Sequence, residues 1–289
     1  MDVSIIIVNY NTKELLDQCL KSIINYTKGC SYEVIVVDNK STDGSKDFFK
    51  KEYPNIKYIY NEENLGFGRA NNVGARYASG EYLFLLNSDT ILISDAISEL
   101  YIKAKEVPRL GVAGCHLINS DGASNVTFGM FPSIKEECHY IIGKIKGIDY
   151  KTVVDREKMN VDFVAGADMM IPRNVYEEMH GFDENIFLYF EETDLQKRMA
   201  LNGFKRVIFA DIDIIHLDGG SFDGKGLTFR RFKFSYTSYN YYLRKYYSGF
   251  FYVTTKLFSA FLRIPHLFRS GWTWSERLES QKLTFGNWK

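Results

Sequence analysis

Four short apolar runs near the start of the chain each stop at polar side chains that could bind a charged ligand. The runs cover residues 3–8, 34–37, 56–60 and 82–86. The polar clusters that follow them cover residues 9–11, 38–39, 61–64 and 87–89. Hydroxyl, amide and carboxylate groups are the donors and acceptors with which proteins hold sugars, phosphates and cations. The pattern therefore predicts a polar binding site.

The last of these clusters has the form of a metal site. Asn87, Ser88 and Asp89 follow an apolar strand, so an amide and a carboxylate stand two residues apart. Residues i and i+2 point to the same side of an extended segment, and hard divalent cations such as Mg²⁺ prefer oxygen ligands. The triplet therefore resembles a D-x-D metal site whose first Asp is Asn. The alternative is an Asx-turn or a cap for a helix starting at Ser94.

Two further clusters favour a nucleotide as ligand. Asp38 ends the second apolar run, where a carboxylate can accept hydrogen bonds from a ribose hydroxyl or a base N–H. The alternative is helix capping, which suits Asp43 better. The segment 64–72 carries Asn64, two glycines, Arg69 and Asn72 at an expected helix start, where free backbone N–H groups favour phosphate. The glycines are also compatible with a plain strand-to-helix turn.

Three carboxylates crowd into the segment 191–194, behind an aromatic run. Glu191, Glu192 and Asp194 complement a helix dipole if a helix begins there, and Asp194 with Arg198 forms an ordinary i,i+4 pair. A carboxylate at a cleft can also act as general base for a hydroxyl nucleophile. Both interpretations stay open.

His216 is the strongest histidine candidate of the five. It follows a strand pattern at 205–215 and precedes a Gly-Gly pair. Most single histidines are structural, but one at a strand end can coordinate a metal or contact a diphosphate.

The elements that position these residues read as an α/β fold. Helical patterns separate the four apolar runs, at 12–24, from about 43, at 66–78 and at 94–105. The four strands should therefore be parallel, and their carboxyl ends should lie along one edge of the sheet. Open α/β sheets bind their ligands at that edge. Further patterns predict strands at 110–117, 161–171 and 205–215 and a helix at 174–179, whereas 119–160 has no clear periodicity.

Composition and charge divide the chain. The 289 residues are 45% hydrophobic and 25% charged, which predicts a globular protein of one elaborated domain or two small ones. Net charge is zero, but residues 225–289 hold twelve of the 36 Lys and Arg and two of the 36 acids. The tail is therefore about +10 and the rest about −10. We expect a catalytic domain at 1–222, with halves 1–118 and 119–222, and a helical region at 223–289.

The cysteines and the apolar segments predict a cytoplasmic protein. The four cysteines form no CxxC pair, which fits reduced thiols. The chain begins with a strand pattern and shows no secretion signal. The longest apolar stretch in the tail, 250–262, is too short to cross a bilayer.

The tail combines many Phe, Tyr and Trp with interleaved Arg and Lys. Helices of this composition lie in the headgroup region of anionic membranes, which predicts peripheral contact with the cytoplasmic face. The alternative is that the aromatics pack on the catalytic domain or in a homo-oligomer. No recognisable nucleic-acid-binding module is present, so nucleic acid is not an expected partner.

The motifs at 4–11, 36–44, 64–74, 85–89 and 181–198 together resemble glycosyltransferase family 2, particularly its rhamnosyltransferase-like members. The resemblance covers residues 3 to about 222. It implies the GT-A fold, with a mostly parallel central sheet and helices on both faces. It also implies a nucleoside-diphosphate sugar donor (a UDP- or dTDP-sugar), a divalent cation (Mg²⁺ or Mn²⁺) and transfer, with inversion at the anomeric carbon, to a saccharide or lipid-linked acceptor in cell-surface glycan synthesis.

The resemblance also assigns roles by position. Asp38 would bind the nucleoside in a pocket lined by Asn9 and Tyr10, and the diphosphate or sugar would meet Asn64, Arg69, Asn72, Asn87 and Ser88. Asp89 would be the chief metal ligand and His216 a second one. Glu192 would be the catalytic base, with Glu191 and Asp194 on the acceptor side.

Two departures from the family pattern leave rival functions open. The family usually has Glu-Asp where this chain has Glu191-Glu192, and Asn87 is a poorer cation ligand than Asp. A catalytically inactive nucleotide-sugar-binding scaffold is one rival. A hydrolase with Asp89 and Glu192 flanking a glycosidic bond is another, although it leaves the nucleotide-facing loops without a purpose.

Overall fold

The four predicted strands at the start of the chain form one parallel sheet. The computed structural model describes residues 1–136, 138, 142, 146, 158–217 and 228–285. The strands are β1 (Val3–Asn9), β2 (Tyr32–Asp38), β3 (Lys57–Tyr60) and β4 (Tyr82–Asn87), in the spatial order β3-β2-β1-β4. The parallel register places Asn9 opposite Asp38 and Val8 opposite Asn87. The polar clusters therefore share one edge, as predicted.

The second half of the chain extends this sheet in mixed orientation. β10 (Asp168–Pro172) runs antiparallel between β4 and β6 (Leu110–Ile118), and β11 (Lys205–His216) is parallel to β6. β5 (Thr90–Leu92) and β8 (Lys158–Asn160) pair antiparallel with β11. The result is a mixed, mostly parallel sheet. A small second sheet joins β7 (Phe128–Gly129) to β9 (Phe163–Val164), so the strand predicted at 161–171 is split at its small-residue break.

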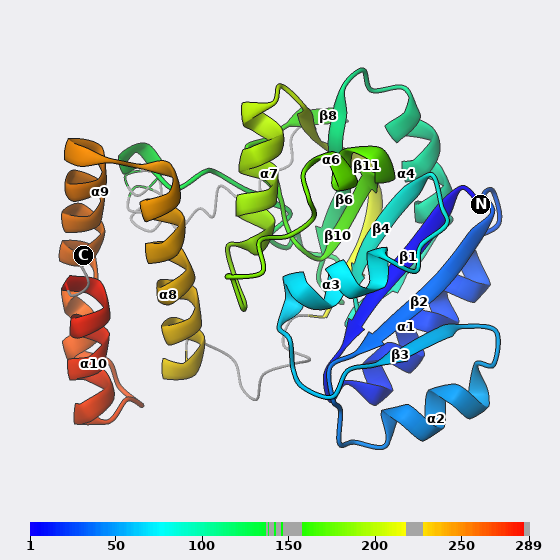
Figure 1. Cartoon of the computed structure of the whole chain (residues 1–289), viewed down its shortest axis with the longest axis horizontal. Helices are drawn as coiled ribbons and strands as arrows, with labels where there is room; N and C mark the ends of the chain where they lie inside the picture. The colour runs from blue at the N-terminus through cyan, green and yellow to red at the C-terminus, as the bar shows by residue number, and fades with distance from the viewer. Residues whose placement is uncertain (137, 139–141, 143–145, 147–157, 218–227, 286–289) are drawn as a thin grey trace.

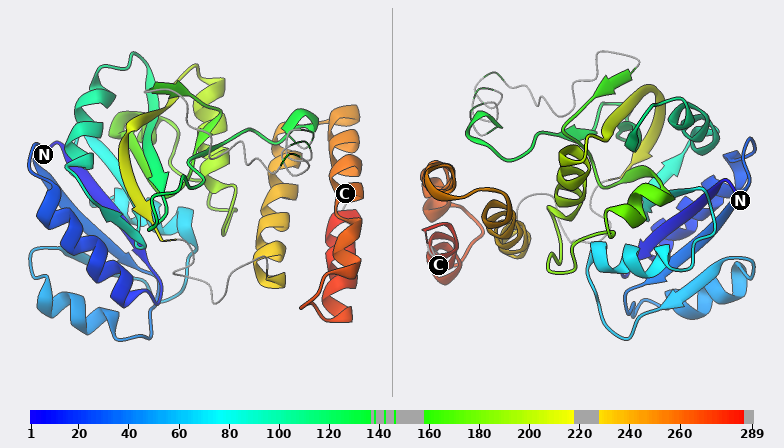
Figure 2. Two further views of the ribbon diagram at one scale, coloured as in Figure 1. Left: turned by 180° about the vertical axis from the view of Figure 1, so that it is seen from behind. Right: turned by 45° about the horizontal axis from the view of Figure 1, so that its top comes forward.

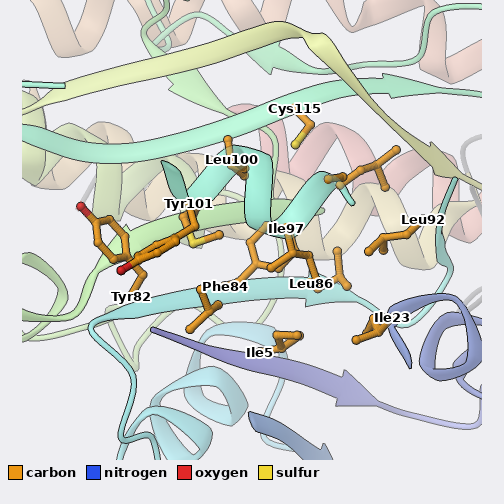
Figure 3. Packing of buried hydrophobic residues seen from close by; sticks show 14 of the residues in the cluster. Ile5, Ile23, Tyr82, Phe84, Leu86, Leu92, Ile97, Leu100, Tyr101 and Cys115 are labelled. Carbon is orange, nitrogen blue, oxygen red and sulfur yellow. The ribbon is translucent and has the colours of Figure 1, made fainter. Parts of the chain in front are cut away.

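Helices cover both faces of the sheet (Figure 1). The helices that pack against one face are α1 (Lys13–Tyr26), α2 (Ser45–Glu52) and α4 (Ala96–Lys105). The helices that pack against the other face are α3 (Phe67–Ala75), α6 (Arg173–Glu178) and α7 (Glu191–Leu201). Because side chains alternate along a strand, β1 sends Ile5 into the first layer and Ile6 into the second. Figure 3 shows the first layer, where Ile5, Phe84 and Ile97 lie close together.

The tail forms a helical layer beside the sheet. It consists of α8 (Phe229–Tyr246), α9 (Gly249–Leu262), the 3₁₀ helix η1 (Ile264–Phe268) and α10 (Trp274–Phe285). In both views of Figure 2 α8 stands nearest the sheet, with α9 and α10 on its far side. No helix in the described part of the chain combines the length and apolar character needed to cross a membrane. All four cysteines are free thiols in the structure.

Part of the aromatic tail packs on protein, which was the alternative to membrane contact. A buried cluster on the tail helices joins Phe232, Tyr236, Tyr239, Tyr242 and Trp272, and Phe190 of the sheet domain packs against it. Burying each large aromatic side chain stabilises the fold by roughly 2–3 kcal/mol. The cluster therefore attaches α8 to the rest of the molecule.

Ion pairs complete the attachment of α8. The Lys245 ammonium lies 2.6 Å from an Asp183 carboxylate oxygen and 2.7 Å from Asp194 Oδ1. Tyr246 donates to the same Asp194 oxygen at 2.8 Å, and the Ser238 hydroxyl donates to the Leu188 carbonyl at 2.8 Å. The basic tail thus meets the acidic domain through specific partners.

Candidate active site

Asp89 and His216 meet at the end of the sheet because a short strand intervenes. After β4 the chain turns directly into β5, whose Thr90 lies opposite His216 of β11. The Leu217 N–H then donates to the Asp89 carbonyl at 3.0 Å. As a result Asp89 Oδ1 lies 3.3 Å from His216 Nε2, and the Asn87 side-chain amide lies 3.5 Å from the same nitrogen. Asp89 does not cap the next helix, because α4 has Asp95 at its N-cap position.

These residues line a cleft at the carboxyl ends of the strands, which we call the strand-end cleft. Its volume is about 350 Å³. Of the residues expected to bind a donor, it contains Tyr10, Asn64, Asn87, Ser88, Asp89 and His216. Asn39, from the polar cluster at 38–39, also lines it. The structure adds residues that the sequence patterns did not indicate: Phe187, Leu188, Tyr189, Arg230, Arg231 and Phe234.

Asp38 and Asn9 are fully buried and do not line the strand-end cleft. The Asp38 carboxylate accepts from the Asn9 amide at 2.6 Å, the Tyr58 hydroxyl at 2.6 Å and the Ser41 N–H at 2.7 Å. Burial, followed by the bond to Asp38, raises the pKa of Tyr58, so its hydroxyl stays a donor. The pair therefore shapes the 39–43 loop, and the neighbouring Asn39 reaches the cleft.

Neither α3 candidate lines the strand-end cleft. Asn72 accepts from the Tyr176 hydroxyl at 2.6 Å and the Phe182 N–H at 2.9 Å, and its amide donates to the Phe182 carbonyl at 3.0 Å. Its hydrogen bonds thus hold the 181–182 turn against α3. Arg69 is half-buried on the same helix and is also absent from the cleft wall.

Gly66 joins the start of α3 to the loop on the opposite side of the cleft. Its φ is +80°, and a Cβ built there would lie 2.0 Å from the Phe187 carbonyl oxygen. The Phe67 N–H donates to that oxygen at 3.2 Å, and the Asn39 amide donates to the Gly66 carbonyl at 3.0 Å. Only glycine fits such an approach without strain. The glycine therefore serves a turn, and Gly66 itself lines the strand-end cleft.

A second and larger cavity opens on the other side of Tyr189, and we call it the tail-side cleft. Its volume is about 840 Å³. Glu192, Thr193 and the small residues Ala165 and Gly166 form part of its wall. The tail supplies Phe232, Ser235, Tyr236, Tyr239, Leu262, Arg263, Pro265, His266 and Arg269. Tyr189 lines both clefts, so the two cavities are neighbours.

Of the three carboxylates at the start of α7, only Glu192 faces a cleft. Successive helical residues point about 100° apart, so Glu191, Glu192 and Asp194 cannot share one direction. Glu191 is 4% exposed, and burial together with its neighbour Glu192 raises its pKa well above the usual range. Asp194 is fully buried between Arg198 and Lys245. Neither of these two, which were expected on the acceptor side, lies in the wall of the tail-side cleft.

The chain between the two clefts is strained. Tyr189 and Phe190 have φ values of +65° and +69°, a conformation that costs non-glycine residues of order 1 kcal/mol or more each. Residues 187–189, which end at this pair, line the strand-end cleft. Glu192, in the first turn of α7 just after the pair, lines the tail-side cleft. Tyr189 and Phe190 thus form the stretch of chain between the two cavities.

Helix α8 contributes to both cavities from one rigid element. Arg230, Arg231 and Phe234 line the strand-end cleft, whereas Phe232 and Tyr236 line the tail-side cleft. The Arg231 guanidinium also donates to the Tyr189 hydroxyl at 3.2 Å. No sequence pattern distinguished these residues from the remaining aromatic and basic residues of the tail.

Asp168 is a buried acid beneath this region that the sequence did not single out. It is the first residue of β10 and accepts from the Cys115 N–H at 2.5 Å. Burial raises its pKa to about 8, with the backbone bond and the charge of His216 acting in the opposite direction. At neutral pH the Asp168 carboxyl is therefore protonated in the folded protein.

Asp89 and His216 form an open donor set for a cation. Within the described ranges no three His, Cys, Asp or Glu side chains converge on one point, so the protein alone supplies no closed cage. A carboxylate beside an imidazole and an amide nevertheless suits Mg²⁺ or Mn²⁺ when phosphate oxygens complete the coordination. The residues present fit such an ion.

The α/β fold is of the GT-A type, and solved structures share it. The similarity to mannosyltransferase PcManGT from Pyrobaculum calidifontis, solved with GDP-Man and Mn²⁺, has a TM-score of 0.60 at 15% identity and covers 96% of this chain and 73% of that one. For S. aureus TarS in complex with UDP the TM-score is 0.56 at 16% identity, with 93% and 73% covered.

The sequence comparisons define the family. Residues 4–180 match the model of glycosyl transferase family 2, and the chain belongs to this family. It is 25% identical over 231 residues to the N-acetylglucosaminyl-diphospho-decaprenol L-rhamnosyltransferase of Mycobacterium tuberculosis, covering 73% of this chain and 75% of the relative. It is 28% identical over 239 residues to rhamnosyltransferase WbbL of Escherichia coli, covering 77% and 87%. The protein is therefore a glycosyltransferase.

Proposed function

We propose that the protein transfers a sugar, with inversion, from a UDP- or dTDP-sugar to a hydroxyl group of a saccharide or lipid-linked saccharide in cell-surface glycan synthesis. The observation that carries this proposal is the meeting of two clefts at Tyr189, one with Asp89 and His216 and the other with Glu192. The printed activities of the two rhamnosyltransferases support it. The GDP-Man and UDP complexes of the structural neighbours support a nucleotide-linked donor.

The donor would occupy the strand-end cleft. Its diphosphate would lie among Asn64, Ser88 and the two arginines Arg230 and Arg231, and Tyr10 would contact the nucleoside. Asp38 and Asn9 would act on the nucleoside through the loop that they hold. We assign Asn72 to holding the 181–182 turn against α3 rather than to direct contact, because its hydrogen bonds go to that turn and it lies outside the cleft wall. Arg69 also lies outside the cleft wall.

A divalent cation, Mg²⁺ or Mn²⁺, would be held by Asp89 and His216, with Asn87 beside them. When bound, such an ion neutralises charge that grows on the leaving diphosphate. The arginines of α8 carry charge of the same sign into the same cleft. They would stabilise the diphosphate by charge-assisted hydrogen bonds.

Glu192 would activate the acceptor from the tail-side cleft. It removes the proton from an acceptor hydroxyl while the oxygen attacks the anomeric carbon. The bond from that carbon to the diphosphate oxygen breaks, and the electron pair leaves with the nucleoside diphosphate. Attack opposite to the leaving group inverts the configuration. The additional methylene of Glu relative to Asp lets the carboxylate reach farther into the cavity.

The test is Glu192→Gln, which removes the base and keeps the size of the side chain. We expect turnover of a UDP- or dTDP-sugar to fall about 10²–10⁴-fold, with donor binding by calorimetry unchanged. Glu178→Gln is the matched control, because Glu178 is exposed on α6 and lines neither cleft. Near-normal turnover in Glu192→Gln would remove Glu192 from this role.

The same assay separates the rival functions. Donor binding without turnover in the wild-type protein, across Mg²⁺ and Mn²⁺ and a panel of acceptors, would favour the inactive scaffold. Cleavage of a glycoside with no nucleotide donor present would favour the hydrolase.

We further propose that the tail contacts the cytoplasmic face of a membrane. Several apolar side chains of the tail are exposed on its surface, among them Phe250, Phe251, Phe261, Phe268 and Trp274. Aromatic side chains of this kind partition into the headgroup region, and nearby Arg and Lys favour anionic lipid. Co-sedimentation with phosphatidylglycerol vesicles tests the contact, and loss of co-sedimentation is expected when Phe250→Ser and Phe251→Ser are combined.

A further inference from the structure

Tyr189 occupies the junction of the two clefts. Among the described residues of the two cleft walls, it is the one that both share, and it is half-buried. The walls approach each other again at Gly166 of the tail-side cleft. A Cβ built there would lie 3.7 Å from Glu192 Cγ and 3.9 Å from Phe67 Cε1, and Phe67 lines the strand-end cleft. Glu192 therefore stands close to the strand-end cleft.

Helix α8 holds the segment 187–190 at this junction, because each of its four residues has a partner on that helix. The contacts, in chain order, are Phe187 with Phe234 (ring centroids 5.1 Å apart), the Leu188 carbonyl with the Ser238 hydroxyl (2.8 Å), the Tyr189 hydroxyl with the Arg231 guanidinium (3.2 Å) and Phe190 with Tyr239 (ring centroids 5.5 Å apart). Tyr189 therefore has little freedom to leave the junction while α8 is docked.

The backbone at Tyr189 is in a conformation that favours glycine. Its φ is +65°, in the left-handed region where a Cβ is crowded. Strain of this kind persists where the surrounding contacts impose it, and it is concentrated at functional sites. A glycine would adopt the same conformation without strain, but it would leave the junction without a side chain. The ring of Tyr189 is therefore the feature that calls for a function.

Water competes with the acceptor in a sugar transfer. The tail-side cleft has a volume of about 840 Å³ and a polar wall around Glu192, so it has room for water when no acceptor is bound. A water activated by Glu192 would form a bond to the anomeric carbon and give a proton to the carboxylate. The bond from that carbon to the diphosphate oxygen would break, its electron pair would leave with the nucleoside diphosphate, and free sugar would result. Closed active sites suppress such hydrolysis by excluding water.

We propose that Tyr189 shields the bound sugar donor from water in the tail-side cleft and so directs the sugar to the acceptor. The ring narrows the junction, so that a hydroxyl positioned by the acceptor's own contacts reaches the anomeric carbon and loosely held water does not. Arg231 keeps the ring in place through the tyrosine hydroxyl, and a guanidinium has enough N–H groups to bind a diphosphate as well. The inference rests on the proposed function, because it concerns the outcome of the same reaction.

Tyr189→Gly is the principal test, because glycine fits a φ of +65° and removes the ring. The substrates are UDP-glucose and dTDP-rhamnose, each at saturating concentration with Mn²⁺ and without acceptor, and the measurement is the rate of free sugar release by the full chain. We expect Tyr189→Gly to hydrolyse at least one donor about tenfold faster than the wild type, since water gains access to the anomeric carbon. Replacing a merely structural residue would lower this rate. No rise with either donor would overturn the proposal.

Two further variants separate the ring from its surroundings. Tyr189→Phe keeps the ring and loses the hydrogen bond from Arg231, so hydrolysis should stay at the wild-type rate. Phe187→Ala removes another ring of the same segment, one that lines the strand-end cleft alone, and it should not raise hydrolysis either. A rise in either variant equal to that in Tyr189→Gly would overturn the proposal, because loss of the hydroxyl or loosening of the segment would then suffice. Melting temperatures are compared, and Tyr189→Gly should stay folded because relief of backbone strain offsets the lost ring packing.

The same assay separates this inference from the proposed function. When Tyr189→Gly is combined with Glu192→Gln, hydrolysis should fall, because the base that activates water is gone. If the combined variant hydrolyses donor as fast as Tyr189→Gly alone, the assignment of the base fails and the shielding by Tyr189 stands. If the wild type transfers sugar to no acceptor while Tyr189→Gly still hydrolyses donor faster than the wild type, the proposed transfer fails and the shielding of the donor stands.

Discussion

The two clefts that meet at Tyr189 are built in different ways. The floor of the strand-end cleft, with Asn87, Asp89 and His216, lies at the ends of β4 and β11, so a continuous hydrogen-bonded sheet fixes its position. The tail-side cleft is assembled from the start of α7, the 126–136 segment and helices more than thirty residues farther along the chain. The position of the strand-end cleft depends on strand register, whereas that of the tail-side cleft depends on how the tail helices pack on the rest of the molecule. Substitutions that disturb the packing of the tail should therefore affect the tail-side cleft more than the strand-end cleft.

A large loss of activity is the effect that tests the strand-end cleft alone. Asp89→Asn removes the charge beside His216 and should lower kcat/KM for sugar transfer about 10²–10³-fold, the loss typical when one electrostatic stabiliser is removed. The measurement is a steady-state assay titrated with Mn²⁺. Asp47→Asn, on the exposed side of α2, is the control. An unchanged Mn²⁺ dependence in Asp89→Asn would contradict the metal assignment.

Gly66→Ala tests the connection between the two sides. Its Cβ would collide with the Phe187 carbonyl at a backbone φ of +80°, so we expect the free energy of unfolding to fall by about 3 kcal/mol. Gly44→Ala is a matched control, because Gly44 has a φ of +82° with open space around it. Urea unfolding should therefore show a smaller loss at Gly44, about 1 kcal/mol. Equal losses would mean that the contact with Phe187 is unimportant.

Asp168→Asn tests the buried acid under the sheet edge. The pKa is raised from 3.8 to about 8 on folding, so between these values the unfolded chain has lost a proton that the folded protein keeps. The stabilisation is complete below the lower value and is lost as pH rises through the higher one. The wild-type protein should lose up to about 1.4 kcal/mol of stability for each pH unit in this window.

The amide introduced by Asp168→Asn can still accept the Cys115 N–H bond but cannot ionise. Urea unfolding at pH 5 and pH 7, as chosen test conditions, should therefore show a steeper decline for the wild type than for Asp168→Asn. Parallel declines would show that Asp168 ionises normally in the folded protein.

The smallest effect concerns the docking of α8. Lys245→Met removes the cation between Asp183 and Asp194, and because the lysine is partly exposed we expect a loss of about 1–2 kcal/mol. Lys233→Met is the control, since Lys233 pairs with Glu279 at the tail surface. Limited proteolysis of the tail and the KM for acceptor should change more than donor affinity. A larger change in donor affinity would contradict the division of labour between the clefts.

The strand-end side could be read from the sequence because its determinants are local. Four apolar runs with helical patterns between them imply parallel strands, and parallel strands bring their carboxyl ends to one edge. The contact of Asp89 with His216 could not be predicted in this way, because it depends on β5. This strand has only three residues, too few to show a periodicity in the sequence. Asp38 was placed correctly along the chain, but its burial depends on Tyr58 and Asn9, which lie on neighbouring strands.

The tail-side cleft was largely beyond prediction. That only one of the three acids on α7 faces the cavity follows from helical geometry, yet which one depends on how α7 packs against β9 and α8. The aromatic tail residues divide into a buried cluster and an exposed set, and composition alone cannot distinguish Tyr242, which is fully buried, from Phe250, which is 76% exposed. Residues 137–157 and 218–227 include half of the segment 119–160, which lacked a periodicity, and the expected domain boundary at 222. Apart from 138, 142 and 146, these positions lie outside the described residues.

Because α8 supplies side chains to both cavities, it would couple donor and acceptor in the proposed function. If occupancy of one cavity shifts or steadies this helix, the affinity of the other cavity changes by some factor. Thermodynamic reciprocity then requires the second ligand to change the affinity for the first by the same factor. A single helix would then be the means by which two reactants bind cooperatively.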